Sequence, residues 1–495
     1  MHGQALRNAQ RYEEAYEKDI TAEMRPVFHL TPRVGWMNDP NGFSYYNGEY
    51  HIFYQYNPYS SHWDTMHWGH AKSKDLIHWE YLPAVMAPDE EYDFEGCFSG
   101  DAIELDDGRQ MLIYTGVSVG KDSEGRRVQS QDQNIAFGDG TDYVKYEQNP
   151  VIRQELIPGD IRKGEFRDPK IWRDKNGDFV CLASVMTKER LGRIVLFKSQ
   201  DGINWKYWNT LIENDGSFGK MWECPDLFEL DGRWVFLTSP MDMVPKGFEY
   251  HNGNGNLCMI GDFDEEEGVF TPESDHAIDY GIDFYATQTT RSPDGRLIML
   301  GWLQNWDACA VRELDEPWAG QLSTPRELSI KNGRLYQTPV RELEKLRADK
   351  VEYTDVEVGE NTELEGINGR VLDMEISIRA KNKEALYEKF AIWFAKQDDM
   401  HTALRFRPHD GTLKVDRKFS GSRRAILHQR RCYVGGHDGS LKLRIIMDRF
   451  SAEIFINDGE KVMSVTLYTG LDADGIAFRA DGDVVMDITK YSLKD

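Results

Sequence analysis

Two carboxyl groups about 5 Å apart can cleave a glycosidic bond with retention, one attacking the anomeric carbon and the other protonating the leaving oxygen. The chain has three acids in suitable contexts: Asp39 in WMNDPNG, Asp168 in EFRDPK and Glu223 in MWECPD. Each lies eight residues before an Asn-Gly or Asp-Gly pair. Like charges held close together cost free energy unless they serve chemistry, so the shared spacing predicts a functional group of acids.

The neighbours of the three acids predict different roles for them. Asn38 and the backbone N–H groups of the Pro-Asn-Gly turn would keep Asp39 ionised, as a nucleophile requires. Arg167 would lower the pKa of Asp168, which suits that carboxylate to holding substrate hydroxyls. Glu223 lies among an indole, a thiol and another carboxyl group in MWECPD, a setting typical of a general acid/base.

The elements that position these acids are predicted from a repeat. A polar head, an apolar stretch, an Asn-Gly or Asp-Gly pair and a second apolar stretch recur five times. The five units are NDPNGFSYYNGEYHIFYQ, FSGDAIELDDGRQMLIYTG, FRDPKIWRDKNGDFVCLAS, ECPDLFELDGRWVFLTS and FYATQTTRSPDGRLIMLGW. Such pairs favour type I′ turns, because both central residues need positive φ, so each unit predicts a β-hairpin. The pairs lie 55 to 69 residues apart, which predicts a four-stranded sheet per unit and a five-bladed β-propeller.

Equivalent positions in successive blades lie at one height around the axis of a propeller. Counting back eight residues from each turn gives Asp39, Ser99, Asp168, Glu223 and Ala286, the last beside a tyrosine. Three carboxylates would therefore point into one central funnel. The alternative is that each acid only caps a turn, and the register could slip by a residue or two.

The pattern changes after about residue 338. TPVRELEKLRADK predicts a short amphipathic helix, and the alternating stretches VLDMEISIRA, LKLRIIMD, AEIFIN and KVMSVTLY predict a second all-β domain, most simply a two-sheet sandwich. We therefore expect a polar helical extension at 1–26, a catalytic propeller at 27–338, a linker helix at 339–350 and a β-sandwich at 351–495.

Composition excludes several classes of function. The formal charge of −25 argues against nucleic acid as a partner, because binding it needs a cationic surface. No apolar stretch approaches the roughly 18 residues of a membrane span, and the polar start does not look like a secretory signal, so we expect a cytoplasmic protein. The six cysteines lack paired spacing and predict reduced thiols rather than a disulfide framework or zinc site.

A metal site at His62, His67 and His70 is a weaker alternative. These residues lie close together in HWDTMHWGH, but neither an HExxH motif nor a His-rich helix supports metal binding, so a structural or substrate-lining role is favoured. Sugar rings stack on indole rings, which makes Trp63 and Trp302 candidates for the substrate pocket.

The same motifs match a known family. WMNDPNG, FRDPK and WECPD, in this order, resemble the three signature motifs of glycoside hydrolase family 32, which includes invertases, sucrose-6-phosphate hydrolases, levanases and inulinases. The resemblance covers nearly the whole chain from about residue 27. It extends to YQYNP, HWGHAKSKDLIHWE, FSGDA, GIDFYA, GWLQNW and DRFSAEIFINDG.

The resemblance implies a five-bladed propeller with a C-terminal β-sandwich, and hydrolysis of β-fructofuranosyl bonds with retention through a fructosyl-enzyme. It implies neither a metal nor an organic cofactor. By the matching motifs, Asp39 is the nucleophile, Glu223 the acid/base and Asp168 the transition-state stabiliser. The implied fructose pocket maps onto Asn38, Gln55, Trp63, Phe98, Ser99, Arg167, Asp283 and Trp302.

The expected partner is a small sugar: sucrose, sucrose 6-phosphate or a short fructo-oligosaccharide. GIDFYATQTT and WAGQLSTPREL make the chain most similar to the intracellular bacterial sucrose and sucrose-6-phosphate hydrolases. A 6-phosphate would favour a cation at the pocket rim, and Lys170 and Arg312 are candidates. A homodimer is left open.

Two rival functions remain. An inverting five-bladed glycosidase acting on arabinan or xylan would use the same acids with a wider gap for water, and product stereochemistry separates it. A non-catalytic sugar-binding propeller would keep the aromatic residues but has no reason to keep all three acids.

Overall fold

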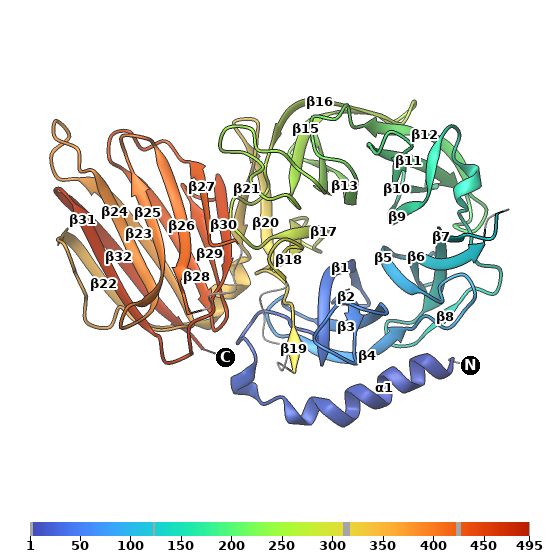
Figure 1. Cartoon of the computed structure of the whole chain (residues 1–495), viewed down its shortest axis with the longest axis horizontal. Coiled ribbons are helices and arrows are strands. Elements are labelled where there is room, and N and C mark those ends of the chain that lie inside the picture. Colours follow the sequence, from blue (N-terminus) through green and yellow to red (C-terminus); the bar gives the residue numbers. More distant parts are fainter. Residues whose placement is uncertain (1–2, 122–123, 310–316, 422–426, 495) are drawn as a thin grey trace.

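The chain folds into a five-bladed β-propeller followed by a β-sandwich, as the sequence predicted (Figure 1). The structure is a computed structural model that describes residues 3–121, 124–309, 317–421 and 427–494. The first strands of the five blades, β1, β5, β9, β13 and β17, surround the central axis (Figure 1). Among the described residues, no helix has the length and apolar character needed to cross a membrane.

Each blade is a sheet of four strands, and blade 1 gains a short fifth strand. Blade 1 consists of β1 (Gly35–Tyr46), β2 (Glu49–Asn57), β3 (His67–Ser73), β4 (Glu80–Met86) and, parallel to β1, β19 (Trp318–Ala319). Blade 2 consists of β5 (Gly96–Glu104), β6 (Gln110–Lys121), β7 (Arg127–Gly138) and β8 (Tyr143–Lys145). Blade 3 consists of β9 (Ile161–Arg173), β10 (Phe179–Thr187), β11 (Gly192–Ser199) and β12 (Lys206–Glu213). Blade 4 consists of β13 (Trp222–Leu230), β14 (Arg233–Pro240), β15 (Leu257–Asp264) and β16 (Val269–His276). Blade 5 consists of β17 (Tyr285–Arg291), β18 (Leu297–Trp302), β20 (Arg326–Lys331) and β21 (Arg334–Pro339).

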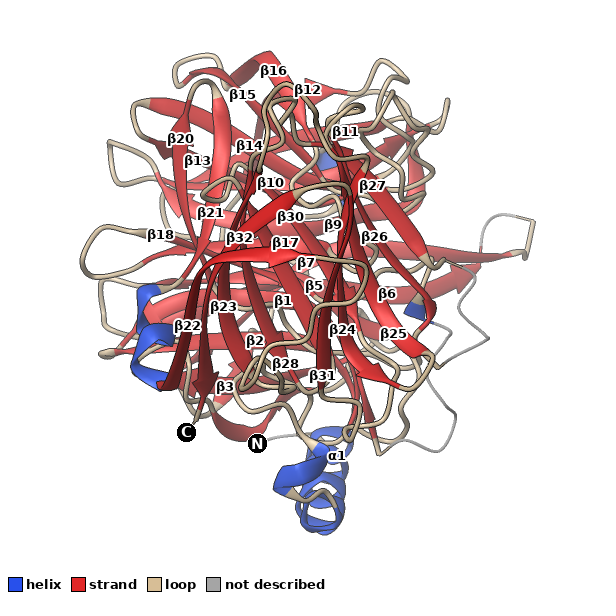
Figure 2. Ribbon diagram, turned by 90° about the vertical axis from the view of Figure 1, so that its left-hand side faces the viewer, coloured by secondary structure: helices blue, strands red, loops and turns tan. Residues whose placement is uncertain are grey.

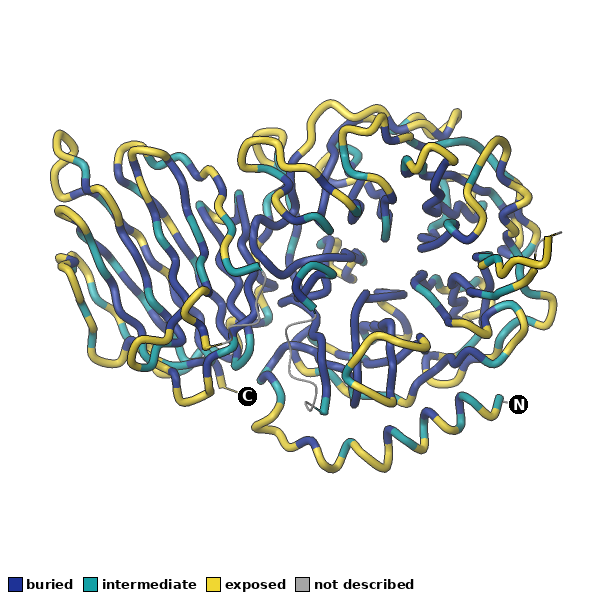
Figure 3. The backbone as a smooth tube through the Cα atoms, in the orientation of Figure 1, coloured by how far each residue is buried: buried dark blue, intermediate teal, exposed yellow. Residues whose placement is uncertain are grey.

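The sandwich contains two antiparallel sheets, which face the viewer in Figure 2. The first has the order β22 (Arg347–Val358), β32 (Val484–Leu493), β23 (Leu372–Ala380), β28 (Leu441–Asp448), β29 (Ser451–Ile456) and β30 (Lys461–Thr466). The second has the order β27 (Gln429–Tyr433), β26 (Thr412–Phe419), β25 (Met400–Arg407), β24 (Lys389–Gln397) and β31 (Gly475–Asp481). Buried residues fill the sandwich and the inner strands of the propeller, and exposed residues lie mainly in loops (Figure 3).

All five predicted hairpins form, but their turns are of two kinds. Asn47-Gly48 and Asp231-Gly232 have positive φ at both residues, as a two-residue type I′ turn requires. In the other three hairpins only the glycine has positive φ, and a three-residue loop replaces the expected type I′ turn. Gly108 shows the arrangement, because its N–H donates to Leu105 O in a type I turn and its φ of +81° then closes the loop.

The remaining helical segments are short. The N-terminal helix α1 (Gln4–Tyr16) packs along blade 1 (Figure 1) and is followed by the 3₁₀ turns η1 (Glu17–Asp19) and η2 (Ala22–Met24). A further turn, η3 (Gln154–Leu156), precedes blade 3. Where the sequence predicted an amphipathic linker helix, the chain forms the 3₁₀ helix η5 (Arg341–Leu346), and strand β22 begins at once.

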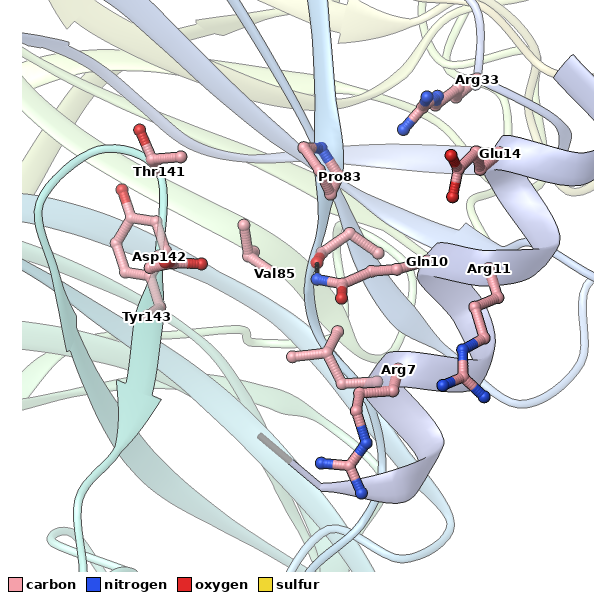
Figure 4. Close-up of a pocket in the computed structure, with 12 residues that line it drawn as sticks. Arg7, Gln10, Arg11, Glu14, Arg33, Pro83, Val85, Thr141, Asp142 and Tyr143 are labelled. Atoms are coloured by element: carbon pink, nitrogen blue, oxygen red, sulfur yellow. Dashed lines mark hydrogen bonds between the residues drawn. The ribbon is translucent and has the colours of Figure 1, made fainter. Parts of the chain in front are cut away.

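A pocket of about 430 Å³ lies between α1 and the wall of the propeller. Gln10, Arg11 and Glu14 of α1 line one side, and Pro83, Val85 and Tyr143 are among the residues opposite (Figure 4). None of the predicted catalytic acids lines this pocket, so it is distinct from the candidate active site.

Candidate active site

A β-bulge interrupts the innermost strand of every blade, at the predicted register position in four blades and one residue after it in blade 4. In four blades two inner-strand residues face one residue of the neighbouring strand, and in blade 2 Ser99 is inserted between two paired residues. The inserted residues are Asn38-Asp39, Ser99, Asp168-Pro169, Cys224-Pro225 and Ala286-Thr287. A bulge redirects side chains and bends its strand, so five bulges at one height build a ring of side chains at the end of the axis.

Asp39 lies on the bulge of β1 and is 9% exposed. The Asn38 amide donates to its Oδ1 at 3.1 Å, and the Ser99 hydroxyl donates to its Oδ2 at 2.9 Å. The Cys224 thiol also donates to Oδ2, at 3.4 Å. Burial and then the charge of Glu223 raise the pKa of Asp39 to about 6, against the lowering effect of these three hydrogen bonds. The carboxyl group is therefore mostly ionised at pH 7.

Asp168 lies on the bulge of β9, with a φ of +60°. The Thr115 hydroxyl accepts its backbone N–H at 3.0 Å, and its Oδ2 accepts the backbone N–H of Cys224 at 2.9 Å. Burial raises the pKa of Asp168 and outweighs the lowering effect of Arg167, and the charge of Glu223 raises it further. The prediction that Arg167 keeps this pKa low is therefore wrong.

Arg167 Nε lies 3.9 Å from Asp168 Oδ2, but the guanidinium makes its hydrogen bonds to two other carboxylates. Its Nε and Nη2 donate to Glu223 Oε1 at 3.1 and 2.9 Å, and its Nη1 donates to Glu165 Oε2 at 2.7 Å. The Tyr285 hydroxyl donates to Glu223 Oε2 at 2.6 Å, and Thr238 donates to the Glu223 backbone carbonyl at 2.8 Å. Both carboxylate oxygens of Glu223 are thus held by a donor, which fixes the plane of the group.

The predicted pocket residues of blades 1 and 2 lie around Asp39. The buried Gln55, which faces the bulge of β1, donates to Cys97 O at 3.0 Å. Phe98, next to Ser99, makes an edge contact with Trp63, with ring centroids 6.1 Å apart. Trp63 is 48% exposed and lies in the loop after β2. Its exposed indole is available to stack on a sugar ring.

Trp302 lies beneath this surface rather than on it. It is fully buried and packs edge-on against Trp36, with ring centroids 5.7 Å apart. The indole of Trp36 donates to Asn38 Oδ1 at 2.7 Å, which links this aromatic pair to the neighbour of Asp39. The Nε1 of Trp302 has no hydrogen-bond partner within the part of the chain that the structure describes.

The structure does not bring Asp283 together with the acids. The residue is fully buried, and its Oδ2 accepts bonds from Arg417 Nη1 at 2.6 Å and from the Thr466 backbone N–H and hydroxyl at 2.8 and 2.9 Å. Both partners belong to the sandwich. The sequence could not indicate this contact, because Arg417 lies 134 residues away.

Lys170, one of the two candidate phosphate-binding cations, is also placed differently from the prediction. Lys170 is 9% exposed and lies on the propeller axis, where its Nζ donates to Gln288 Oε1 and Thr289 O at 3.0 Å each. Asp101 and Asp226 lie 3.5 and 3.6 Å from the same nitrogen. Lys170 is therefore a structural cation below the ring of acids, not a rim residue. Arg312 lies outside the described residues.

The three histidines considered as metal ligands do not converge. His70 Nε2 lies 3.0 Å from the Nδ1 of His51, and the His67 ring bonds to Thr65 O, whereas His62 is exposed. Throughout the described ranges, no group of three or more His, Cys, Asp or Glu residues is arranged to hold a metal ion.

Sequence reasoning did not assign three residues of this site. Cys224 joins Asp39 to Asp168 through its thiol and its backbone N–H. Tyr285 binds Glu223, and its place beside the fifth register position was the available signal. Thr115 of β6 donates to Ser99 O and accepts the N–H of Asp168, and no sequence motif marks it.

Comparison with family models and known proteins gives a consistent result. Residues 29–339 match the model of the glycosyl hydrolases family 32 N-terminal domain, and residues 342–495 match the family 32 C-terminal model. A sucrose-6-phosphate hydrolase of Zymomonas mobilis is 32% identical, over 100% of this chain and 98% of the relative. A raffinose invertase of Escherichia coli is 32% identical, over 93% of each chain.

Solved structures agree with these relatives. A family 32 β-fructofuranosidase of Bombyx mori aligns with a TM-score of 0.84 and 33% identity, covering 100% of this chain and 99% of that one. A sucrose-6-phosphate hydrolase of Lactobacillus gasseri aligns with a TM-score of 0.84 and 28% identity, covering 100% and 97%. With both family models matched and nearly every residue covered, the chain belongs to glycosyl hydrolase family 32.

Proposed function

We propose that the protein is a retaining β-fructofuranosidase that hydrolyses terminal β-D-fructofuranosyl bonds, with Asp39 as nucleophile and Glu223 as acid/base. Membership of family 32 and the named relatives support hydrolysis of this bond. The observation that carries the proposed roles is the bridge at Cys224, which contacts Asp39 and Asp168 and directly follows Glu223. This bridge joins the buried Asp39 and Asp168 next to Glu223, whose side chain is 16% exposed.

The proposed reaction is a double displacement. Asp39 attacks the anomeric carbon of the fructosyl group while Glu223 gives a proton to the leaving oxygen, so the glycosidic bond breaks as the ester bond forms. Water then attacks the same carbon, gives its proton to Glu223 and releases Asp39. Asp168, fixed by the Cys224 N–H, would hold fructose hydroxyls, and Arg167 and Tyr285 orient Glu223.

Replacement of the acids tests these roles. We expect Glu223→Gln to lower kcat on sucrose by about a thousandfold, within the range that general acid catalysis supplies, while sucrose binding persists. Asp39→Asn should abolish turnover because no fructosyl-enzyme can form. Turnover and calorimetric binding on the same preparations measure both effects. Full activity of Glu223→Gln would contradict the assignment, and a wild-type protein that binds sucrose without cleaving it would support a sugar-binding propeller.

The substrate class is a second part of the proposal, and a comparison of reaction rates tests it. We propose sucrose, sucrose 6-phosphate and short fructo-oligosaccharides as the substrate class, which agrees with the names of the relatives. Initial rates on each, together with the anomeric form of the released fructose, discriminate between them. A large advantage in kcat/KM for sucrose 6-phosphate would show a cationic phosphate site, which Lys170 does not supply. Inverted product would instead favour the arabinan- or xylan-type mechanism.

A further inference from the structure

A segment of the propeller continues the edge of the sandwich. Tyr280 N donates to Val462 O at 2.8 Å, and Ile282 N donates to Ser464 O at 2.8 Å, so residues 280–283 run along the edge strand β30. At Gly281, a Cβ atom would lie 2.1 Å from the Ser464 backbone nitrogen, so only glycine permits this approach. Backbone hydrogen bonds to the sandwich thus hold the segment between blades 4 and 5 in position.

A buried ion pair ends this segment. Arg417 and Asp283 are both fully buried, and Arg417 Nη1 lies 2.6 Å from Asp283 Oδ2. The same nitrogen donates to the Thr466 hydroxyl at 2.8 Å, and Arg417 Nε and Nη2 donate to Leu427 O at 3.2 and 3.1 Å. The guanidinium therefore has a fixed position, and Asp283 is fixed with it.

The fixed segment leads directly to the catalytic acid. Only the buried Phe284 separates Asp283 from Tyr285, whose hydroxyl donates to Glu223 Oε2 at 2.6 Å. The Tyr285 hydroxyl also lies 3.0 Å from Ser239 O. Asp283 and Tyr285 are both buried and only two positions apart, so a displacement of the ion pair would also move the phenol ring.

We infer that Arg417 of the sandwich is a positioning residue for catalysis, which acts through Asp283 to hold Tyr285 against the proposed acid/base Glu223. The C-terminal domain is then part of the catalytic apparatus and not only a stabilising attachment. A purely structural role explains the pair less well, because a buried ion pair is often no more stabilising than apolar residues of the same size. Such pairs are better suited to specifying one arrangement, and the arrangement here ends at Glu223.

The test separates proton donation from folding. Arg417→Gln and Asp283→Asn are compared with wild type on sucrose and on 4-nitrophenyl β-D-fructofuranoside, whose leaving group needs little protonation. We expect kcat/KM on sucrose to fall about tenfold or more, because small displacements of catalytic groups are costly. The value of kcat/KM on the nitrophenyl substrate reports formation of the fructosyl-enzyme, which needs little proton donation there, and should change little. Arg417→Lys, which keeps the charge, should restore part of the sucrose rate.

Arg444→Gln is the matched control, because Arg444 binds the buried Asp373 within the sandwich, through its Nε at 3.0 Å and its Nη2 at 2.8 Å, away from residues 280–285. It should affect both substrates alike. If Arg417→Gln does not fold, Thr466→Val replaces it in the test. This variant removes the hydroxyl donor to Asp283 and keeps the backbone N–H donor, and it should lower the same kinetic parameter on sucrose only.

Equal losses of kcat/KM on both substrates, or no loss in any folded variant, would overturn the inference. The inference rests on the proposed role of Glu223, and its failure is distinguishable from the failure of that role. A wild-type protein that cleaves neither substrate contradicts the proposed function, whereas normal wild-type cleavage with unchanged variants contradicts only the role of Arg417.

Discussion

Tyr285 makes the shortest described side-chain hydrogen bond to Glu223, at 2.6 Å. Hydrogen bonds to charged groups contribute about 1.5–3 kcal/mol, so we expect Tyr285→Phe to lower kcat on sucrose by about tenfold or more. KM should change little, because the hydroxyl contacts Glu223 and Ser239 O rather than an open surface. Steady-state kinetics measure the split between kcat and KM. Tyr433→Phe on the exposed face of the sandwich is the control, and an unchanged kcat in Tyr285→Phe would show that Arg167 alone positions Glu223.

The pKa of Asp39 sets the acid limb of the pH profile. Burial and the charge of Glu223 raise this pKa to about 6, and attack requires the ionised form, so kcat/KM should rise with pH through about 6. Ser99→Ala removes a hydrogen bond that lowers the pKa of Asp39, and the limb should move to higher pH. Rates on sucrose between pH 4 and 8 measure the shift. Ser44→Ala, at the outer end of β1, should leave the limb unchanged, and a shift to lower pH in Ser99→Ala would contradict this account.

The hairpins and their bulges explain how much of the site was predictable. Asn-Gly and Asp-Gly pairs mark turns through local backbone conformation, so the five hairpins and the shared height of Asp39, Ser99 and Asp168 could be predicted without tertiary information. In blade 4 the bulge begins at Cys224, one residue after the predicted Glu223. The direction of a side chain beyond a bulge depends on what packs against it. That packing comes from another blade or from the sandwich. For this reason the sequence makes Lys170 a candidate rim residue, although its Nζ in fact binds Gln288 of blade 5.

The helix α1 offers a test of how one element docks on the propeller. Glu13 of α1 is fully buried, and its carboxyl group accepts the Ala84 N–H at 3.1 Å. Burial raises the pKa of Glu13 to about 7, against the effects of that N–H and of Arg33. A raised pKa stabilises the docked helix fully below the ordinary glutamate value of about 4.5, and this contribution is lost as pH rises through about 7.

Amide hydrogen exchange of residues 4–16, corrected for intrinsic exchange rates, should therefore show weaker protection at pH 8 than at pH 5.5. In Glu13→Gln, whose side chain is neutral, protection should not depend on pH over this range. The exposed Glu14 provides the control variant Glu14→Gln, which should behave like wild type. Equal protection of wild-type α1 at both pH values would show that Glu13 is not the group that controls docking.

Three parts of the chain meet in one buried charge cluster at the interface of the domains. His29, from the segment before β1, bonds to Asp448 and Glu453 of the sandwich at 3.0 Å each. Arg326 of blade 5 donates to Glu453 Oε2 at 2.6 Å and to Asp279 Oδ2 at 3.1 Å. The cluster joins the start of the propeller, its last blade and the sandwich, so the two domains are expected to unfold together.

The pKa values of this cluster predict a window of maximum stability. Burial lowers the pKa of His29, but the hydrogen bonds and charges of Asp448 and Glu453 outweigh it and raise the pKa to about 9. This contribution is complete below the ordinary histidine value of 6.5 and is lost as pH rises through about 9. Burial raises the pKa of Glu453, but Arg326 and His29 outweigh it and lower the pKa to about 2. That contribution is present above about 4.5 and is lost as pH falls through about 2.

The cluster should therefore stabilise the molecule most between about pH 4.5 and 6.5, with a decline on both sides. His29→Gln leaves the buried Asp448 without its cation, whereas Glu453 keeps Arg326. Breaking such a group costs about 3–5 kcal/mol, so the free energy of unfolding should fall by that order at pH 6. The difference between variant and wild type should shrink as pH rises through 9, because wild-type His29 then loses its charge. Urea unfolding at pH 6 and 9.5 measures both effects, and the exposed His251 supplies the control His251→Gln. A destabilisation that is equal at the two pH values would mean that His29 acts by packing and not by charge.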